Sequence, residues 1–319
     1  MNFSFTYFLA RVVRAIGVVW AAFTVAFVIL YLLPGDPVTI LLGTDSYIDP
    51  AKVEALRSQY RLDDPLLAQY SAQLFNVLRG DLGTSIQNGA PVSSAILTAL
   101  PETLKLSFAA LFLAVLLAVS IAFASTYTRA NWLRRLLLSI PPLGVALPTF
   151  WVGLLLIQVF SFHFAVLPAV GNAGLDSLVL PAITLALPTS AGLAKVFAQG
   201  LDYAWSQPYI DTAKAKGVSR RRILFSHAAK NALLPASTLL AITFGNLLAG
   251  AVVTETVFSR VGIGRLTESA VAAQDTPTVQ GLVLLVALIF ALLSLATDLV
   301  LPLLDPRIQV RRPATRRTV

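Results

Sequence analysis

Residues 106–128 read LSFAALFLAVLLAVSIAFASTYT, and this stretch decides the class of fold. Its 23 residues carry no charge and lie between Lys105 and Arg129. A helix needs about 20 apolar residues to cross a hydrocarbon core about 30 Å thick. The stretch therefore predicts a membrane-spanning α-helix.

Five further stretches meet the same test: residues 15–35, 136–163, 179–201, 234–253 and 279–297. The fourth of the six contains Lys195, whose long side chain can extend toward the membrane edge. The alternative for the first stretch is a cleaved signal peptide, but its apolar part exceeds the usual length of about 7–15 residues. The sequence thus predicts an all-α polytopic membrane protein with six spans.

The charged residues predict an orientation for these spans. The chain has 24 Lys and Arg against 16 Asp and Glu, with 56% apolar residues and a mean hydropathy of +0.76. Sixteen of the cations fall before the first span, after the second, after the fourth and after the sixth. Because cytoplasmic loops collect Lys and Arg, both termini are expected to be cytoplasmic. The net charge of +8 is therefore a topology signal and not a nucleic-acid site.

The residue inventory argues against chemistry within this chain. It has no cysteine and only two histidines, His163 and His227, so neither a thiolate nucleophile nor a metal site is expected. An intramembrane enzyme would lack its catalytic set, and the absence of a Gly-Lys dipeptide excludes a phosphate-binding Walker loop. Glu102 and Lys105 are expected to pair across one helical turn, and Glu255 is expected to have a structural role.

The segment between the first two spans is expected to form two short external helices. Asp49-Pro50 and Asp64-Pro65 each offer a capping carboxylate followed by a proline suited to the first helical position. The second helix has an apolar stripe and closes at Arg79-Gly80. This stripe is consistent with two roles, packing at the membrane surface or docking of an extracytoplasmic partner.

The connection at residues 206–235 has the most specific pattern, SQPYIDTAKAKGVSRRRILFSHAAKNALLP. Pro208 is expected to start a helix, Gly217 to end it in the left-handed conformation, and Ser219 to cap a second helix from Arg220. Small residues near the glycine would let another protein approach the backbone closely. A docking loop is one interpretation, and a solvated basic loop is the other.

Here the chain resembles a known family. YIDTAKAKG at 209–217 followed by HAAKNALLP at 227–235 is similar to the EAA loop of ABC-importer permeases of the dipeptide, oligopeptide and nickel subfamily. LPGDP at 33–37, GDLGTS at 80–85 and AGAVVTETVFSRVGIGRL at 249–266 extend the resemblance along the chain. The general motif has glutamate where this sequence has Asp211, and alanine where it has Thr212.

The resemblance implies a permease of the type I importer fold in the bacterial inner membrane. Such a chain would form half of a path for peptides, with nickel or another small solute as the alternative. A second permease, two ATP-binding subunits carrying ATP and Mg, and an extracytoplasmic binding protein would be its partners. The division would be residues 1–97 for the first span and external segment, 98–305 for the transmembrane core, and 306–319 for a basic tail. An ion-coupled secondary transporter is the rival of another class.

The resemblance also implies three groups of site residues. Those expected to contact the ATPase are Tyr209, Ile210, Asp211, Thr212, Ala213, Ala215 and Gly217, with Tyr209 and Ile210 filling a groove of that subunit. Those on the external side are Gly35, Asp36, Pro37, Gly80, Asp81 and Gly83. Prolines interrupt helical hydrogen bonding, so a path or hinge is expected at Pro141, Pro148, Pro181 and Pro188.

Overall fold

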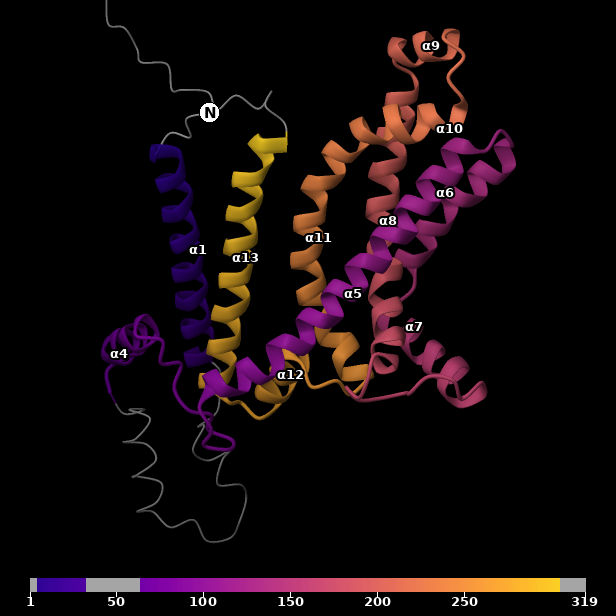
Figure 1. The fold of residues 1–319 in the computed structure, drawn as a ribbon. Helices are drawn as coiled ribbons and strands as arrows, with labels where there is room; N and C mark the ends of the chain where they lie inside the picture. The colour runs from indigo at the N-terminus through magenta and orange to yellow at the C-terminus, as the bar shows by residue number, and fades with distance from the viewer. Residues whose placement is uncertain (1–4, 33–63, 305–319) are drawn as a thin grey trace, which may run out of the picture.

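The computed structural model describes residues 5–32 and 64–304, and these residues are almost entirely helical (Figure 1). The helices are α1 (Phe5–Leu32), α4 (Leu66–Leu78), α5 (Val92–Tyr127), α6 (Asn131–Ala146), α7 (Thr149–Leu156), η1 (Ile157–His163), α8 (Asp176–Trp205), α9 (Pro208–Ala215), α10 (Arg220–Arg222), η2 (Ile223–Ala228), α11 (Ala229–Val257), α12 (Ile263–Ala272) and α13 (Thr276–Leu304). The predicted helix after Asp49-Pro50 and the tail at 306–319 lie outside the described residues.

Four of the described helices are long and apolar enough to cross a membrane, namely α1, α5, α8 and α13. The pair formed by α6 and α7 with η1 makes a fifth if it is counted as one span. The predicted fifth stretch, 234–253, lies within α11, which runs over 29 residues from Ala229 to Val257. The described residues therefore show an all-α membrane protein with four or up to five spanning helices.

The predicted third span, residues 136–163, is interrupted near its middle. α6 ends at Ala146 and α7 begins at Thr149, and the two are bent by 100°. Pro148 lacks an N–H and disfavours helical backbone at the preceding residue, and Leu147 is indeed extended, with φ −90° and ψ 132°. The chain therefore turns sharply at this proline.

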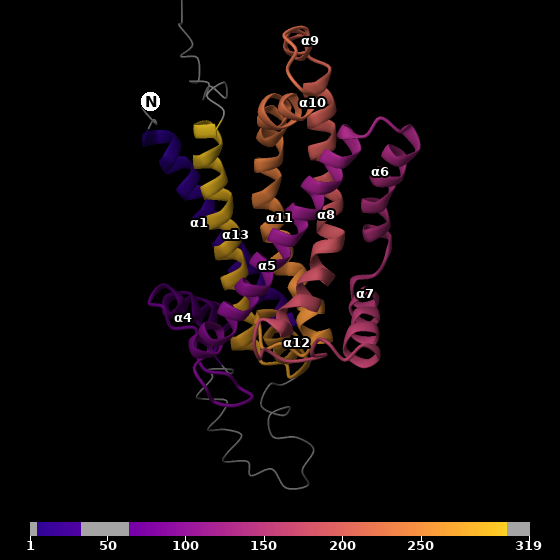
Figure 2. The same ribbon diagram turned by 45° about the vertical axis from the view of Figure 1, so that its right-hand side comes forward.

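The helices arrange the chain into two ends. The N-terminal end of α1, the α5–α6 turn, α9, α10 and the C-terminal end of α13 lie at one end, whereas α4, α7 and α12 lie at the other (Figures 1 and 2). Within the described residues, the helix ends and connections that the sequence predicts to share one face therefore lie at one end of the molecule.

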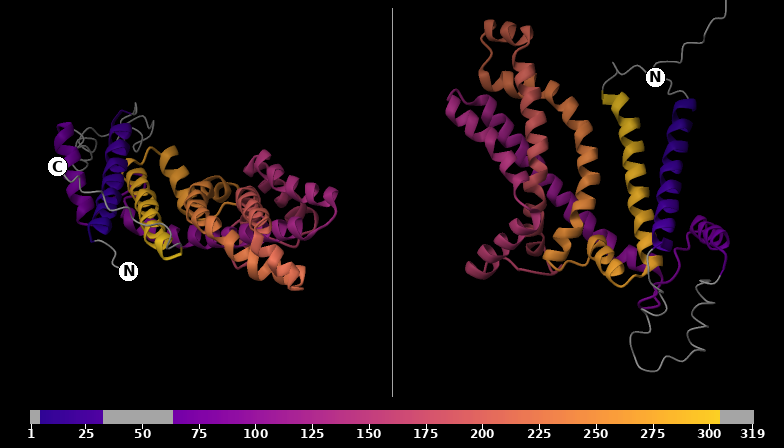
Figure 3. Two further views of the ribbon diagram at one scale, coloured as in Figure 1. Left: turned by 90° about the horizontal axis from the view of Figure 1, so that it is seen from above. Right: turned by 180° about the vertical axis from the view of Figure 1, so that it is seen from behind.

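The core lies where α5 crosses α8 and α11. Alanines at every fourth position of α5, from Ala110 to Ala122, are buried and pack against α8. Small residues let helix backbones approach closely, which gives association through van der Waals contact in lipid. α1 and α13 pack beside each other and away from this core (Figure 3).

The helix predicted after Asp64-Pro65 is confirmed as α4, and it begins at Leu66. The N-cap position is held by Pro65 instead of Asp64, and no side-chain hydrogen bond caps the helix. Tyr70 is the stripe residue that connects it to α1, through an OH to Oγ1 distance of 2.9 Å to Thr24 and ring contacts with Phe23 and Phe27. Packing within the chain thus accounts for part of the apolar stripe.

Candidate functional site

The predicted docking loop stands at the end of the molecule where α8 finishes. α9 projects beyond α10 and the ends of the long helices (Figure 1). Pro208 occupies the first turn of α9, and Gln207 before it is extended. Both short helices begin at the residues expected from the sequence, Pro208 and Arg220.

Gly217 makes the turn between the two helices. Its φ of +71° lies in the left-handed region, where a side chain is strained. Its N–H donates to the carbonyl of Lys214 at 2.9 Å, and the N–H of Val218 donates to the carbonyl of Ala213 at 3.1 Å. This pair of bonds is the Schellman arrangement, which satisfies the last carbonyls of α9. The Ser219 side chain makes no capping bond, so its capping role is limited to its extended backbone.

The structure corrects the role expected for Ile210. Its side chain is fully buried and packs with Ala213 and Ile223, and Trp205 and Val218 lie against this cluster. It is therefore not available to fill a groove on a partner, and it instead fixes α9 to the rest of the chain. The sequence missed this because the partner of Ile210 lies beyond the turn, in η2.

Ala213 of the predicted contact set is also buried in this cluster, whereas the other members of the set lie on the exposed surface. The exposed ones are Tyr209, Asp211, Thr212, Ala215 and Gly217. Asp211 pairs with Lys214 at 2.9 Å on the exposed surface. A surface pair of this kind contributes little to stability, about 0.3–0.5 kcal/mol. The outer face of α9 is therefore polar, small and open to a partner.

Arg220 joins the loop to the end of α5. Its Nη2 donates to the carbonyl of Thr126 at 3.1 Å, and its guanidinium lies 5.3 Å from the ring centroid of Trp205 and 5.8 Å from that of Tyr127. Such cation–π contacts contribute about 0.5–1 kcal/mol at exposed sites and more where water is excluded. Movement of the loop is thus mechanically connected to α5 and α8.

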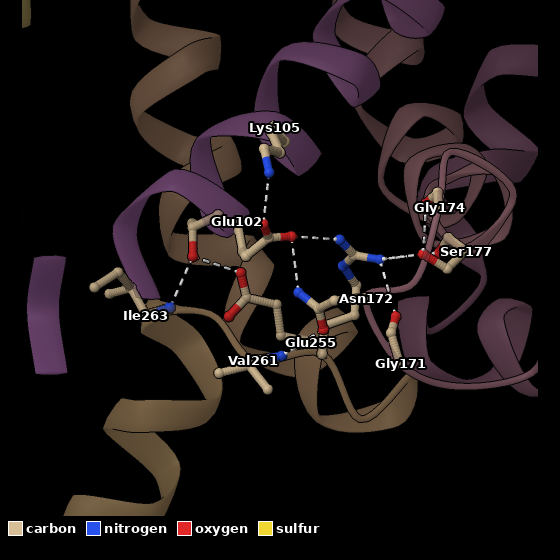
Figure 4. Close-up of polar contacts among 11 residues, drawn as sticks. Glu102, Lys105, Gly171, Asn172, Gly174, Ser177, Glu255, Val261 and Ile263 are labelled. Carbon is tan, nitrogen blue, oxygen red and sulfur yellow. Dashed lines mark hydrogen bonds and ion pairs between the residues drawn. The ribbon is translucent and has the colours of Figure 1, made fainter. Parts of the chain in front are cut away.

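A buried polar network lies at the opposite end (Figure 4). Glu255, which is 1% exposed, accepts hydrogen bonds from the hydroxyl of Thr103 at 2.6 Å and from the N–H groups of Gly264 and Arg265 at 2.7 and 3.2 Å. Thr103 in turn accepts from the N–H of Ile263 at 2.7 Å. The carboxylate therefore sits at the N-terminus of α12, where helix N–H groups and the helix dipole favour negative charge.

Arg260 forms the second half of this network and is 2% exposed. Its Nη1 donates to the carbonyls of Gly171 and Ser177 at 3.1 and 3.0 Å, and its Nη2 donates to Glu102 at 3.1 Å. Burial lowers the pKa of the Arg260 guanidinium, while the charges of Glu102 and Glu255 oppose that shift. The arginine ties the loop after η1 to the start of α5.

Part of this network could be predicted from the sequence. The pairing of Glu102 with Lys105 is confirmed at 2.7 Å, and the structural role expected for Glu255 agrees with its contacts. Arg260 was not among the predicted residues. The sequence signal nearest to it is Gly-Ile-Gly at 262–264, which marks the close approach of the backbone to Glu255. A Cβ on Gly262 would overlap the Glu255 carboxylate.

The residues predicted for the external side and the four predicted hinge prolines lie in different parts of the chain. Gly80 and Gly83 have φ values of +81° and +80°, and Asp81 accepts a hydrogen bond from the N–H of Gly83 at 2.9 Å, all beside α4. Gly35, Asp36 and Pro37 lie outside the described residues. Pro141, Pro181 and Pro188 lie inside continuous helices, and Pro148 marks the sharp bend. The structure does not bring these groups together with the α9 loop.

Comparison with known proteins agrees with these features. Two family models match: "Binding-protein-dependent transport system inner membrane component" over residues 110–310, and its N-terminal companion over residues 4–107. The glutathione transport system permease protein GsiC of Salmonella paratyphi A is 33% identical over 96% of this chain and 99% of its own length. The Escherichia coli K12 protein of that name is 32% identical with the same coverage.

Solved structures show the same fold. A chain of the MetNI methionine ABC transporter, in an inward-facing conformation, superposes with a TM-score of 0.56 and 17% identity. The match covers 66% of this chain and 96% of that one. An amino acid ABC transporter gives a TM-score of 0.50 over 68% of this chain. Since the family models together span nearly the whole sequence, this chain belongs to the binding-protein-dependent transport system inner membrane components, the permeases of ABC importers.

Proposed function

We propose that this chain forms half of the path of an ATP-driven importer and converts ATPase movement into movement of its helices. The observation that carries the proposal is the α9 loop, which projects from the cation-rich end with a polar outer face. Its inner face is fixed to η2 through Ile210 and to α5 through Arg220. A push on α9 would therefore displace α8, η2 and α5 together.

The proposed substrate is a short peptide, delivered by an extracytoplasmic binding protein. The support is the name of the curated relatives, which transport glutathione, a tripeptide. Nickel or another small solute is the alternative, and an ion-coupled transporter is disfavoured by the family match. The test is uptake by the reconstituted complex of labelled dipeptides, tripeptides and nickel, with ATP inside or outside the vesicles. Nickel uptake without peptide uptake would overturn the substrate assignment.

The proposed complex contains two permeases, two ATP-binding subunits and the binding protein. ATP and Mg belong to the ATP-binding subunits, because this sequence has no Walker loop. We propose that the second permease is a different chain, so the path is a heterodimer. An active complex purified with this permease alone would contradict the heterodimer.

The proposed topology has six spans with both termini cytoplasmic, where α11 and the bent α6–α7 pair each count as one. The support is that the cation-rich connections share one end of the molecule. The chain has no cysteine, so single cysteines can be introduced directly. Asn88→Cys should react with a membrane-impermeant maleimide in intact cells, and Ser219→Cys only after permeabilisation. The reverse pattern would invert the topology.

The remaining site residues are proposed from the same orientation. Residues 1–97 would face the binding protein through LPGDP at 33–37 and the turn at 80–83, residues 98–305 would form the core, and 306–319 a cytoplasmic tail. Pro148 is the best supported hinge among the four prolines, because the chain bends by 100° there. Replacing Pro148 by alanine should straighten this bend and change transport rate without loss of assembly.

A further inference from the structure

A pocket of about 340 Å³ lies between α4, the turn at residues 81–84 and the beginning of α13. This volume lies within the range of small-molecule sites, about 300–1,000 Å³. The elements that line it, α4 and the beginning of α13, lie at the end of the molecule opposite α9 (Figure 1). In the proposed topology it opens on the external side, where a delivered substrate arrives first.

Two amide side chains of this pocket have polar atoms without partners. Gln280, on α13, is 8% exposed, and its Nε2 is buried with no hydrogen bond. Gln73, on α4, has a buried Oε1 that is likewise unpaired. A buried polar atom without a partner costs about 1–3 kcal/mol. Both residues line the pocket, and rotation of their amide groups would offer it one donor and one acceptor, which match the C=O and N–H of a peptide group.

The charge of the pocket selects one end of a peptide. Asp81 is the sole charged residue among the described residues that line it, and no lysine or arginine is among them. A carboxylate favours a ligand ammonium, whereas nothing there would balance a ligand carboxylate. The remaining polar lining consists of neutral side chains, Gln69, Asn76 and Thr84.

The walls of the pocket are held in place before any ligand binds. Asp275, which is 2% exposed, accepts hydrogen bonds from the hydroxyl of Ser85, from the N–H of Ile86 at 3.0 Å and from the hydroxyl of Thr278 at 2.8 Å. These bonds join the turn to the first residues of α13, on which Gln280 lies. A preorganised site loses less entropy on binding.

We infer that this pocket is a binding subsite for the amino-terminal end of a short peptide. The ammonium group lies near Asp81, and the first peptide group lies between Gln73 and Gln280. The inference rests on the proposed function for the substrate class, and it adds a place where this chain holds that substrate before it enters the path.

The test measures equilibrium binding of radiolabelled tri-alanine to the complex of permeases and ATPases in nanodiscs, without binding protein. Gln280→Leu is expected to weaken binding about tenfold, which corresponds to about 1.4 kcal/mol. Gln73→Leu is a second variant with the same expectation. Gln87→Leu is the matched control, because Gln87 is exposed at the same end and does not line the pocket.

A separate experiment tests whether the pocket holds the amino-terminal end of the peptide. N-acetyl-tri-alanine, which lacks the ammonium, should bind the unaltered complex about tenfold more weakly, and Asp81→Asn should remove that difference. The subsite is overturned if the unaltered complex binds no tri-alanine, or if both glutamine variants bind it with the affinity of the unaltered complex. If the unaltered complex binds N-acetyl-tri-alanine as tightly as tri-alanine, the proposed orientation of the peptide is wrong.

A last experiment distinguishes a free peptide from a segment of the binding protein as the occupant of the pocket. If Gln280→Leu weakens capture of the peptide-free binding protein and leaves tri-alanine binding unchanged, the pocket holds a segment of that protein and the inference is wrong. If the unaltered complex takes up peptide but the glutamine variants bind tri-alanine as the unaltered complex does, the subsite is wrong and the proposed function is unaffected. Nickel uptake without peptide uptake would instead overturn the proposed substrate.

Discussion

The carboxylate of Glu255 accepts a hydrogen bond of 2.6 Å from the hydroxyl of Thr103, which lies 152 residues earlier in the chain. The same hydroxyl accepts the N–H of Ile263 at 2.7 Å. One threonine therefore joins the start of α5, the end of α11 and the beginning of α12. Contacts of this kind fix the end of the molecule opposite α9, and they are open to direct tests.

Thr103→Val should destabilise the protein at nearly constant volume. The substitution leaves the Ile263 N–H without its acceptor and removes one donor from a buried carboxylate, which costs about 1–3 kcal/mol. The measurement is thermal unfolding of the purified complex in detergent. Thr98→Val is the control, because Thr98 is exposed and its hydroxyl bonds to Ser94 in its own helix. Equal melting temperatures for both variants would contradict the role of Thr103.

Gly264→Ala should destabilise the beginning of α12. A Cβ at this position would overlap Cα of Val252 and lie 2.7 Å from its backbone N, and neither atom can move freely. Overpacking of this kind costs about 1–3 kcal/mol, or more where backbone must shift. Gly250→Ala is the matched control, because its Cβ meets only Leu185 at 3.7 Å. If Gly264→Ala assembles and melts as Gly250→Ala does, the close approach is not required.

Arg260→Lys should not preserve the network. A lysine keeps the charge but lacks the planar set of donors with which Arg260 reaches Gly171, Ser177 and Glu102. Loss of one such charged hydrogen bond costs about 1.5–3 kcal/mol. Thermal unfolding again gives the comparison, with Arg265→Lys as the exposed control. A harmless Arg260→Lys would show that charge alone matters here.

Ile210→Ala should loosen the α9 loop from within. Truncation of this fully buried side chain leaves a cavity against Ile223 and costs about 2–5 kcal/mol locally. Hydrogen exchange of the α9 amides should become faster, whereas Tyr209→Ala, at an exposed position, should leave it unchanged. Unchanged exchange in Ile210→Ala would restore the partner-contact role predicted from sequence.

Gly217→Pro should uncouple the ATPase without preventing membrane insertion. Proline cannot adopt the φ of +71°, and it removes the N–H that donates to Lys214 at 2.9 Å. Substrate-stimulated ATP hydrolysis should therefore be lost in the complex. Gly217→Asn is the control, because asparagine tolerates left-handed backbone. Full stimulation in Gly217→Pro would remove the loop from the coupling mechanism.

Much of the α9 loop could be predicted from the sequence because its signals are local. Pro208 and Gly217 mark helix ends through their own backbone preferences, and both stand where the structure needs them. Ile210 could not be placed in the same way. Whether an apolar side chain faces inward or toward a partner depends on what lies across the turn, in this case Ile223.

The sequence by itself determined that the chain is helical and enters a membrane, and which connections gather at one end. Those properties follow from runs of apolar residues and from the positions of Lys and Arg, which act over a few turns of helix. Only the tertiary structure decided that residues 136–163 bend by 100° at Pro148, and that Glu255 closes the beginning of α12. Pro148 signals the interruption locally, but the angle depends on how α6 and α7 pack against α8. The position of the Glu255 carboxylate depends on partners 9 to 152 residues away, which no local pattern specifies.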